Sequence, residues 1–305
     1  MNLNSNTGHY AWLKIKKGFI RNLFNLLVYL ILLDFAFVFL FPYIYMTVTS
    51  LKSPIQLLDM LAKWIPRELH WDNYTLAVKG LDFGRSFGNS LIVTVLSTIG
   101  HVFSASLVAY GFARFRFPGK NILFSIVLFT LIVPAQTVIV PLFIQFNRMR
   151  LLDTYFPLIL PTYLGVGLRG GLFIFIFRQF FLGVPYELEE AARIDGVSDL
   201  GIYFRIVLPI SMSAVLVTSI LSIVWHWNDF FEPMMYLKTK GKFLLPMMLP
   251  NLTFNLESYM QVADNVNKGV IMAGTFLSVM PILVVYLILQ RHFVQSIART
   301  GLTGM

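Results

Sequence analysis

The fold class follows from residues 23–48, LFNLLVYLILLDFAFVFLFPYIYMTV, in which Asp34 is the only charged side chain. A bilayer core is about 30 Å thick, and an α-helix needs about 20 mostly apolar residues to cross it. The whole chain of 305 residues is 57% hydrophobic and 13% charged, whereas a typical soluble domain is about 25% charged. Such a chain has too little polar surface to cover itself in water, so this stretch predicts the first span of a membrane protein.

Further apolar runs of similar length follow along the chain. Alternating apolar and polar residues, which membrane β-strands require, are absent from them. The predicted fold class is therefore all-α, a polytopic membrane protein with six transmembrane helices. We place the spans at Leu23–Val48, Phe87–Phe112, Asn121–Phe146, Phe156–Phe180, Ile206–His226 and Gly269–Gln290. Some spans contain proline, which predicts kinks: Pro134, Pro141, Pro161 and Pro281.

The spans divide the chain into a segment at 1–22, a six-span domain at 23–290 and a tail at 291–305. The two sides carry nearly equal numbers of basic residues, so local clusters decide the orientation. Both clusters predict cytoplasmic termini: Lys14, Lys16, Lys17 and Arg21 precede the first span, and Arg114, Arg116 and Lys120 occupy a short loop without an acid. The first apolar run is too long for a secretory signal and lacks a small-residue cleavage site, so we expect it to remain in the mature protein.

Two compositional features exclude other classes of protein. The formal net charge is +9, but the basic residues are scattered between apolar runs, which suits membrane flanks better than a nucleic-acid groove. The chain has no Cys, which excludes disulfides, thiolate catalysis and cysteine metal sites.

The most informative polar stretch is GVPYELEEAARIDGVSDLGIYFRIVLP, residues 183–209, between the fourth and fifth predicted spans. Pro185 suits the first position of a helix, and acids such as Glu187 favour its positive N-terminal end. Gly196 can end the helix in a left-handed conformation. One face of this helix is narrow enough to enter a groove on another protein, and its members are Leu188, Ala191, Ala192 and Asp195. A surface helix that solubilises a loop remains the alternative from these residues alone.

The residue types and their spacing in this stretch resemble the EAA motif of ABC-importer permeases. The matching positions are Glu190, Ala191, Ala192, Gly196, Ile206, Leu208 and Pro209. The resemblance extends over nearly the whole chain. Within the ABC-importer permeases, the chain most resembles the maltose-type carbohydrate permeases, particularly their second membrane subunit. Supporting stretches are Ser50-Leu51-Lys52, Trp71-Asp72-Asn73-Tyr74, Asn89-Ser90-Leu91, Ala109 to Phe115 with Phe117-Pro118-Gly119, Arg178 to Phe181, Ile194-Asp195-Gly196, Trp225 to Asn228 and Gly301-Leu302-Thr303. The chain departs from the family's pattern at Gly304-Met305, which stops short of the small-and-basic tail that the resemblance implies, so we do not expect the tail to contact the ATPase.

The resemblance implies that this loop is a coupling helix, which docks on a separate ATP-hydrolysing subunit. It implies an ion pair from Glu190 to an ATPase arginine, a turn at Gly196 and a contact face at Ala191 and Ala192. The other implied coupling residues are Glu187, Asp195, Leu208 and Pro209. No Walker-type lysine loop is present, so the chain itself is expected to be no enzyme and to bind no cofactor, with ATP and Mg on the partner ATPase. The other implied partners are a second homologous permease, an ATPase dimer, an extracytoplasmic solute-binding protein, a carbohydrate and the bacterial inner membrane.

Residues for the substrate path are sought among polar and aromatic groups within the spans. Arg169 lies near the middle of the fourth span, where a cation is costly and should face a wet cavity or a buried acid such as Asp34. Trp225, Trp227 and Asn228 lie near the outer end of the fifth span, where aromatic rings stack on sugars or anchor the helix at the interface. We interpret His226 as lacking a second nearby histidine or carboxylate that could share a metal ion, so we predict no metal site there.

Three alternatives stay open beside the sugar importer. An ion-coupled secondary carrier should show paired halves and intramembrane acids, and only Asp34 is a plausible buried acid. An intramembrane enzyme would need a catalytic constellation, and none is evident. Within the importer class, the substrate could be a non-sugar solute such as a phosphodiester or a peptide.

Overall fold

The computed structural model describes the backbone of residues 5–59, 64–167, 169–260 and 268–302, and the side chains of these except 5–17, 135, 257–260 and 291–302. Every regular element in the described residues is helical, which confirms the all-α class. The elements are α1 (Ser5–Ser50), α2 (Pro54–Leu58), α3 (Asp72–Gly80), α4 (Phe83–Arg114), α5 (Lys120–Phe129), α6 (Ala135–Arg148), α7 (Phe156–Tyr163), α8 (Gly170–Leu182), α9 (Tyr186–Ile194), α10 (Asp199–Ile202), the π-helical turn η2 (Tyr203–Val207), α11 (Leu208–Ile210), α12 (Met212–Asn228), α13 (Phe231–Tyr236), the 3-10 turn η3 (Lys240–Lys242), α14 (Leu245–Met248), α15 (Leu252–Met260) and α16 (Lys268–Leu302).

Three helices are long and apolar enough to cross a membrane by themselves. They are Gly18–Ser50 in α1, Phe83–Arg114 in α4 and Lys268–Gln290 in α16. These helices coincide with the first, second and sixth predicted spans. Pro42 in α1 and Pro281 in α16 lie inside continuous helices. With two bent helix pairs counted as spans, the described residues hold up to five.

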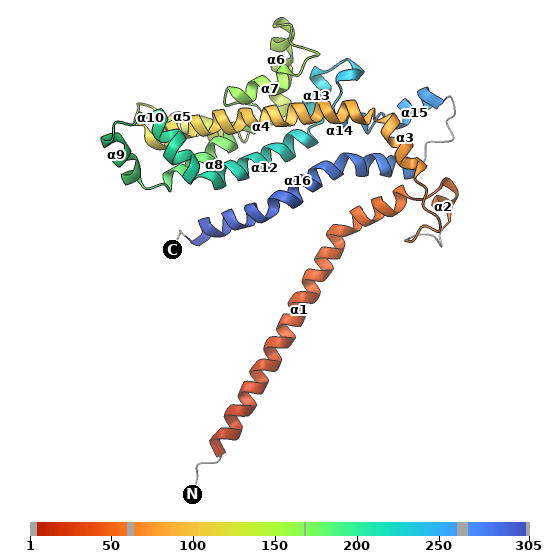
Figure 1. The fold of residues 1–305 in the computed structure, drawn as a ribbon, viewed down its shortest axis with the longest axis horizontal. Helices are drawn as coiled ribbons and strands as arrows, with labels where there is room; N and C mark the ends of the chain where they lie inside the picture. Colours follow the sequence, from red (N-terminus) through yellow and green to blue (C-terminus); the bar gives the residue numbers. More distant parts are fainter. Residues whose placement is uncertain (1–4, 60–63, 168, 261–267, 303–305) are drawn as a thin grey trace.

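Helix α4 is the centre of the bundle, with α7, α8 and α12 packed around it (Figure 1). Its inward face carries small and hydroxyl-bearing residues, which let helices approach closely within a membrane. A Cβ added at Gly100 would overlap Thr162 and Tyr163, so α7 lies directly against the backbone of α4. The buried polar residues of this face include Ser90, Thr94, Ser97, Thr98, His101, Ser104 and Ser106.

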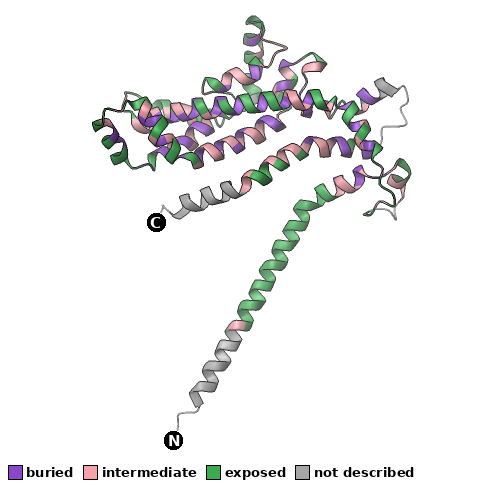
Figure 2. Cartoon of the chain, in the orientation of Figure 1, coloured by how far each residue is buried: buried purple, intermediate pink, exposed green. Residues whose placement is uncertain are grey.

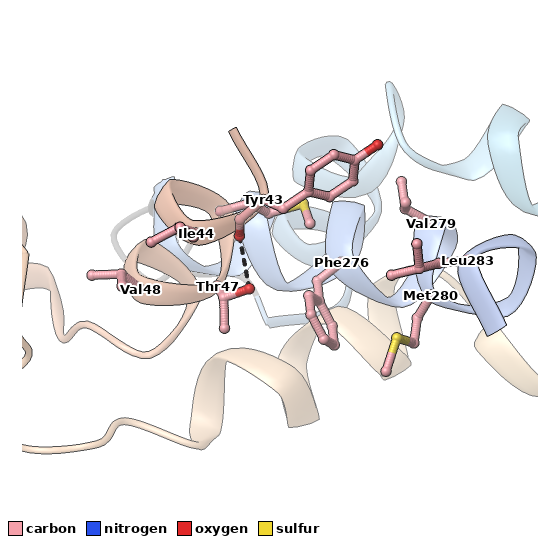
Figure 3. Close-up of a pocket in the computed structure, with 9 residues that line it drawn as sticks. Tyr43, Ile44, Thr47, Val48, Phe276, Val279, Met280 and Leu283 are labelled. Atoms are coloured by element: carbon pink, nitrogen blue, oxygen red, sulfur yellow. Dashed lines mark hydrogen bonds between the residues drawn. The ribbon is translucent and has the colours of Figure 1, made fainter. Parts of the chain in front are cut away.

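Helix α1 extends away from this bundle, as Figure 1 shows. It runs without interruption from Ser5, so the predicted segment at 1–22 continues directly into the first span. The apolar window within Gly18–Ser50 has no buried residue, and the shaft of α1 is coloured as exposed in Figure 2. Only its last turns pack on α16, where they enclose an apolar groove of about 360 Å³ lined by residues such as Tyr43, Thr47 and Phe276 (Figure 3). An exposed apolar surface of this extent requires lipid or another protein chain as its neighbour.

The third predicted span, Asn121–Phe146, is not one helix. It is divided into α5 and α6, because the chain leaves helical geometry after Phe129 and resumes it at Ala135. Pro134 lies directly before α6 and has an extended backbone, and proline lacks the N–H that would continue the helical ladder. Pro141, in contrast, is tolerated inside α6.

The fourth predicted span, Phe156–Phe180, is also broken. Helix α7 ends at Tyr163 and α8 begins at Gly170. Between them Gly165, Gly167 and Arg169 have positive φ angles of 75°, 94° and 61°, a conformation that no α-helix contains. Arg169 is therefore at the N-cap of α8 and not in the middle of a continuous span.

The fifth predicted span, Ile206–His226, starts later than expected. The segment Asp199–Ile210 bends by 77° from Met212–Asn228, so Ile206, Leu208 and Pro209 belong to the preceding turns and not to α12. At the C-terminus, the helix α16 extends through the predicted tail to Leu302. The side chains of 291–302 and residues 303–305, which include Gly304-Met305, lie outside the described part of the chain.

Candidate functional site

The polar stretch at 183–209 folds as a short helix, α9, turned sharply away from the bundle. Its axis bends by 76° from that of α8, and it lies at one end of the molecule in Figure 1. We predicted Pro185 as the first helical residue. In the structure Pro185 is the N-cap, and the helix begins one residue later, at Tyr186. Glu187 and Glu189 occupy its first turn, where carboxylates stabilise the positive end of the helix dipole.

The C-terminal end of α9 has the predicted left-handed glycine. Gly196 has a φ of 78°. The N–H of Gly196 donates to the carbonyl of Arg193 and the N–H of Val197 donates to that of Ala192, each at 3.0 Å. This pair of hydrogen bonds is the Schellman arrangement, which satisfies carbonyls at a helix end and fixes the direction in which the chain leaves.

A buried ion pair, which sequence reasoning missed, fastens α9 to the bundle. The Nε of Arg114, the last residue of α4, lies 2.5 Å from Oε1 of Glu189. The side chains are 7% and 0% exposed. Arg114 also donates from Nη2 to the carbonyl of Val184 at 2.7 Å. Since breaking a buried pair leaves an uncompensated charge, this contact holds α9 firmly to α4.

A second arginine ties α9 to the segment that follows it. Arg193 donates to Asp199 Oδ1 at 3.1 Å and to the hydroxyl of Tyr186 at 3.0 Å. Its Nη2 is 3.8 Å from Oε2 of Glu189, which is too long for a hydrogen bond but close enough for electrostatic attraction. The start of α9, its end and the start of α10 are therefore connected through one guanidinium group.

The two predicted alanines of the contact face lie on different sides of α9. Ala191 is exposed, whereas Ala192 is 7% exposed and packs in the chain's own core. Ala192 therefore anchors the helix, and its side chain is not available for a partner. The exposed face consists of Glu187, Leu188, Glu190, Ala191, Ile194 and Asp195. Ile194, which we did not predict as a contact, is 87% exposed.

Leu208 and Pro209 complete the predicted set but do not join this face. Leu208 is half-buried against the core formed by α4 and α8, and Pro209 is exposed in α11. The preceding turn η2 is fixed by a hydrogen bond of 2.6 Å between the hydroxyls of Tyr203 and Ser106. This part of the motif therefore positions the chain between α10 and α12.

Two of the four predicted substrate-path residues lie together at the break between α7 and α8. The guanidinium carbon of Arg169 lies 5.0 Å from the ring centroid of Trp225, a distance typical of a cation–π contact. Arg169 is exposed. In the described part of the chain it forms no ion pair, and Asp34, the partner that we considered, lies exposed on α1.

The other two residues do not reach this place. Trp227 is 5% exposed and donates its indole N–H to the carbonyl of Ser278 at 3.0 Å. Its ring packs on Phe87, so Trp227 stabilises the core between α4, α12 and α16 instead of lining a path. Asn228 is exposed at the end of α12 and donates to the carbonyl of Val224.

His226 is close to a second histidine, contrary to our reading of its surroundings. Its Nε2 lies 3.3 Å from Nδ1 of His101, and Nδ1 of His101 lies 3.2 Å from the hydroxyl of Ser222. The described residues contain no group of three His, Cys, Asp or Glu that could hold a metal ion. The contact between His101 and His226 links α4 to α12, although 125 residues of sequence separate the two histidines.

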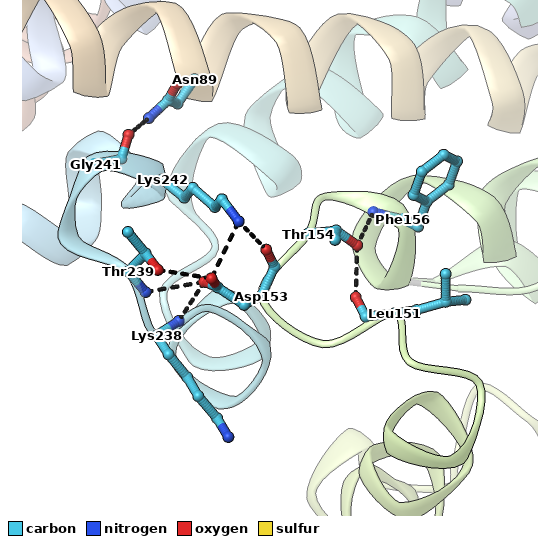
Figure 4. Close-up of polar contacts among 9 residues, drawn as sticks. All are labelled: Asn89, Leu151, Asp153, Thr154, Phe156, Lys238, Thr239, Gly241 and Lys242. Carbon is cyan, nitrogen blue, oxygen red and sulfur yellow. Dashed lines mark hydrogen bonds and ion pairs between the residues drawn. The ribbon is translucent and has the colours of Figure 1, made fainter.

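The opposite end of α4 carries a polar clasp between two loops (Figure 4). Asp153 accepts hydrogen bonds from the N–H groups of Lys238 and Thr239 at 2.9 Å and from the Thr239 hydroxyl at 2.7 Å. Its carboxylate also lies 3.1 Å from Nζ of Lys242. The side-chain and backbone hydrogen bonds from Thr239 hold the pKa of Asp153 well below its usual range. Asn89 of α4 donates to the carbonyl of Gly241, which fixes the clasp to the bundle.

Comparison with known proteins gives a consistent family. Residues 102–299 match the family described as "Binding-protein-dependent transport system inner membrane component". The arabinooligosaccharides transport system permease protein AraQ of Bacillus subtilis is 31% identical over 272 residues, which are 88% of this chain and 92% of that protein. The polygalacturonan/rhamnogalacturonan transport system permease protein YtcP of the same organism is 30% identical, over 90% and 96% of the two chains.

A third relative and a solved structure agree with these matches. The probable starch degradation products transport system permease protein AmyC of Thermoanaerobacterium thermosulfurigenes is 30% identical, over 84% of this chain and 89% of that protein. A chain from the crystal structure of a bacterial ABC transporter involved in alginate import superposes with a TM-score of 0.74 at 23% identity. That superposition covers 89% of this chain and 97% of the other.

Proposed function

This chain belongs to the family of binding-protein-dependent transport system inner membrane components, and we propose that it forms half of the translocation pathway for an oligosaccharide. As a member of that family it is a multi-pass inner-membrane permease subunit of an ABC importer. Its role is transport and not catalysis, because the ATPase of such importers is a separate component.

The substrate class is supported by the relatives. Their names refer to arabinooligosaccharides, to polygalacturonan and rhamnogalacturonan, and to starch degradation products. These saccharides differ in monomer and in charge, yet each relative aligns over more than four fifths of this chain. A saccharide is the class that these names share, and a non-sugar solute is the alternative.

The proposed assembly joins this subunit to a second, homologous permease, two ATPase copies and an extracytoplasmic solute-binding protein. The exposed apolar shaft of α1 and the exposed apolar residues of α6 support a second membrane subunit. The chain crosses the bacterial inner membrane six times with both termini in the cytoplasm. Residues 1–22 and 291–305 are its terminal segments, and α9 lies on the cytoplasmic side.

One observation carries the proposed mechanism: α9 presents an exposed docking face while a buried ion pair fastens it to α4. Glu190, Ala191 and Asp195 on that face meet the ATPase, with Glu190 opposite an arginine of that partner. Closure of the ATPase dimer then displaces α9. Because Glu189 is paired with Arg114, the displacement reaches α4 and the helices packed on it, which exchange inward-facing and outward-facing arrangements.

The proposed substrate contact is the break between α7 and α8. There an exposed cation, Arg169, lies over the ring of Trp225. A guanidinium donates to sugar hydroxyls or to acidic sugars, and an indole ring packs on the apolar face of a pyranose. The break also presents the N-terminal end of α8, as discontinuous helices do at transport sites.

Reconstitution tests this function. The importer, purified through a tag on this chain, should contain a second permease and two ATPase copies by intact mass. In proteoliposomes it should take up a labelled arabino- or malto-oligosaccharide only with ATP on the ATPase side and the binding protein on the other. Transport by this chain alone, driven by an ion gradient, would instead establish a secondary carrier, and uptake of peptides but not saccharides would refute the substrate class.

A further inference from the structure

A shallow basic hollow lies beside α5, at the end of the molecule that carries α9. It has a volume of about 450 Å³ and is lined by Arg116, Phe117, Gly119, Lys120, Asn121 and Ile122. We call these residues the basic hollow. Its lining begins two residues after Arg114, the residue that holds α9.

Three cations gather at the basic hollow without a matching acid. Arg116 and Lys120 line it. Arg178 of α8, whose guanidinium carbon lies 4.2 Å from the Phe124 ring centroid, is near enough for its charge to act on Lys120. Among the described residues no carboxylate pairs with any of the three, and the buried Nε of Arg178 has no hydrogen-bond partner. The pKa of Lys120 is lowered, mainly because partial burial removes water from its ammonium group and, to a smaller extent, because Arg178 and Arg116 repel it. Lys120 donates from Nζ to the carbonyl of Phe115 at 2.9 Å, but no described carboxylate balances the charges, so the site carries a net positive field.

The start of α5 adds to this field. Gly119, at the N-cap, has no side chain to satisfy the first amides of the helix, and the first turn contains no acid. Free N–H groups and the helix dipole make such an end a place for an anion. Lys120 at this position opposes the dipole, so a bound anion would relieve both repulsions.

An apolar stripe leads away from the basic hollow along α5. Ile122, Ile126 and Phe129 are 70%, 54% and 62% exposed and share one face because they recur at helical spacing. A free inorganic anion would gain nothing from this stripe. A molecule with an anionic head and an apolar tail would cover both parts.

We propose that the basic hollow binds the phosphate headgroup of an anionic phospholipid whose acyl chains lie along Ile122, Ile126 and Phe129. The lipid belongs to the leaflet on the side of α9. Only the assignment of that leaflet to the cytoplasm rests on the proposed function. Basic pockets at the ends of membrane helices are suited to such headgroups.

The test measures phosphatidylglycerol binding to the intact importer by native mass spectrometry, with phosphatidylcholine as the zwitterionic reference. The double variant Arg116→Gln/Lys120→Gln should bind phosphatidylglycerol more weakly, by about fivefold for each cation removed, or about 1 kcal/mol each. Arg116→Lys/Lys120→Arg keeps both charges and should bind as the wild type does. Arg148→Gln, which removes an exposed cation at the end of α6, is the matched control and should have no effect.

Three results would overturn the proposal. If the wild type and the double variant each bound phosphatidylglycerol no more tightly than phosphatidylcholine, the charges would recruit no headgroup. Displacement of the lipid by inorganic phosphate, with Phe129→Ala having no effect, would assign the site to a free anion. Disulfide formation between an Ile122→Cys variant and a cysteine of the second permease would show that a protein covers the stripe.

Discussion

Two interruptions of the apolar bundle, α9 and the break between α7 and α8, hold their arginines in opposite ways. At α9, Arg114 and Glu189 are almost inaccessible and lie 2.5 Å apart. At the break, Arg169 is exposed and its described contact is the face of Trp225, 5.0 Å away. A buried pair is expensive to separate, whereas an exposed cation can exchange an aromatic contact for another ligand at little cost.

This difference supports our proposal that α9 transmits force and that the break between α7 and α8 exchanges binding partners. The ion pair makes α9 and the end of α4 one mechanical unit. The break offers an exposed cation, an aromatic ring and positive-φ backbone in one place.

Arg114→Ala should have the largest effect, because it leaves the carboxylate of Glu189 buried without its partner. We expect a loss of about 3–5 kcal/mol of unfolding free energy, together with loss of coupling between ATPase activity and transport. Thermal or denaturant unfolding of the purified importer measures the first effect. Glu187→Ala on the exposed side of the same helix should change stability by less than about 0.5 kcal/mol, and equal losses in both variants would remove the distinction between them.

Gly196→Val should reduce coupling more than any change on the exposed face of α9. A β-branched residue is strained at a φ of 78°, so the Schellman end is lost and the docking helix is misdirected. ATPase stimulation by the loaded binding protein and sugar uptake in vesicles measure the effect. Gly196→Asn, which tolerates this backbone better, should retain more coupling; identical behaviour of the two variants would contradict the role of the left-handed turn.

Glu190→Ala should weaken ATPase association by one or more orders of magnitude while leaving the fold intact. Removing one member of a docked charge pair costs about 2–5 kcal/mol, and Glu190 is exposed, so it contributes little to the subunit's own stability. Co-purification of the ATPase as a function of salt measures the change. Wild-type association and coupling in this variant would falsify the docking assignment of Glu190.

Arg169→Leu should impair transport or alter sugar preference without changing assembly. The substitution removes the cation over Trp225 but leaves the break between the helices in place. Uptake at several sugar concentrations separates the loss of affinity from the loss of turnover. A cysteine at position 169 should react with aqueous thiol reagents in at least one nucleotide state, and its protection in every state would exclude the path assignment.

Asp153→Asn should have the smallest effect, a loss of about 0.5–1.5 kcal/mol, because the amide keeps one oxygen that can accept hydrogen bonds of the clasp. Since folding lowers the pKa of Asp153, its contribution is fully present above the pKa of the unfolded chain, about 3.9. The contribution is lost as the pH falls toward the folded pKa. The stability difference between wild type and variant should be constant from about pH 7 to 5 and shrink below about pH 4; a difference that grows at low pH would contradict this sign.

Local signals in the sequence predicted some details of the site well. The left-handed end of α9 at Gly196 was predictable because glycine is the residue that adopts a positive φ without strain. The exposure of Glu190 and Ala191 follows from the polarity of their segment. The contact of Arg114 with Glu189 was not predictable, because 75 residues separate the two and each is adjacent to residues that read as ordinary loop charges.

Local features of the sequence were enough to predict the membrane class, the first, second and sixth spans, and the position and C-terminal end of α9. Each of these depends on hydrophobicity or backbone preference within a few turns of helix. Contacts between distant segments account for what the sequence did not predict: the breaks in the third and fourth apolar runs, the late start of the fifth, the burial of Trp227 and Ala192, and the contact of His101 with His226. A break in a membrane helix is stable only where neighbouring helices or a wet cavity satisfy the freed backbone groups, and those neighbours come from distant parts of the chain.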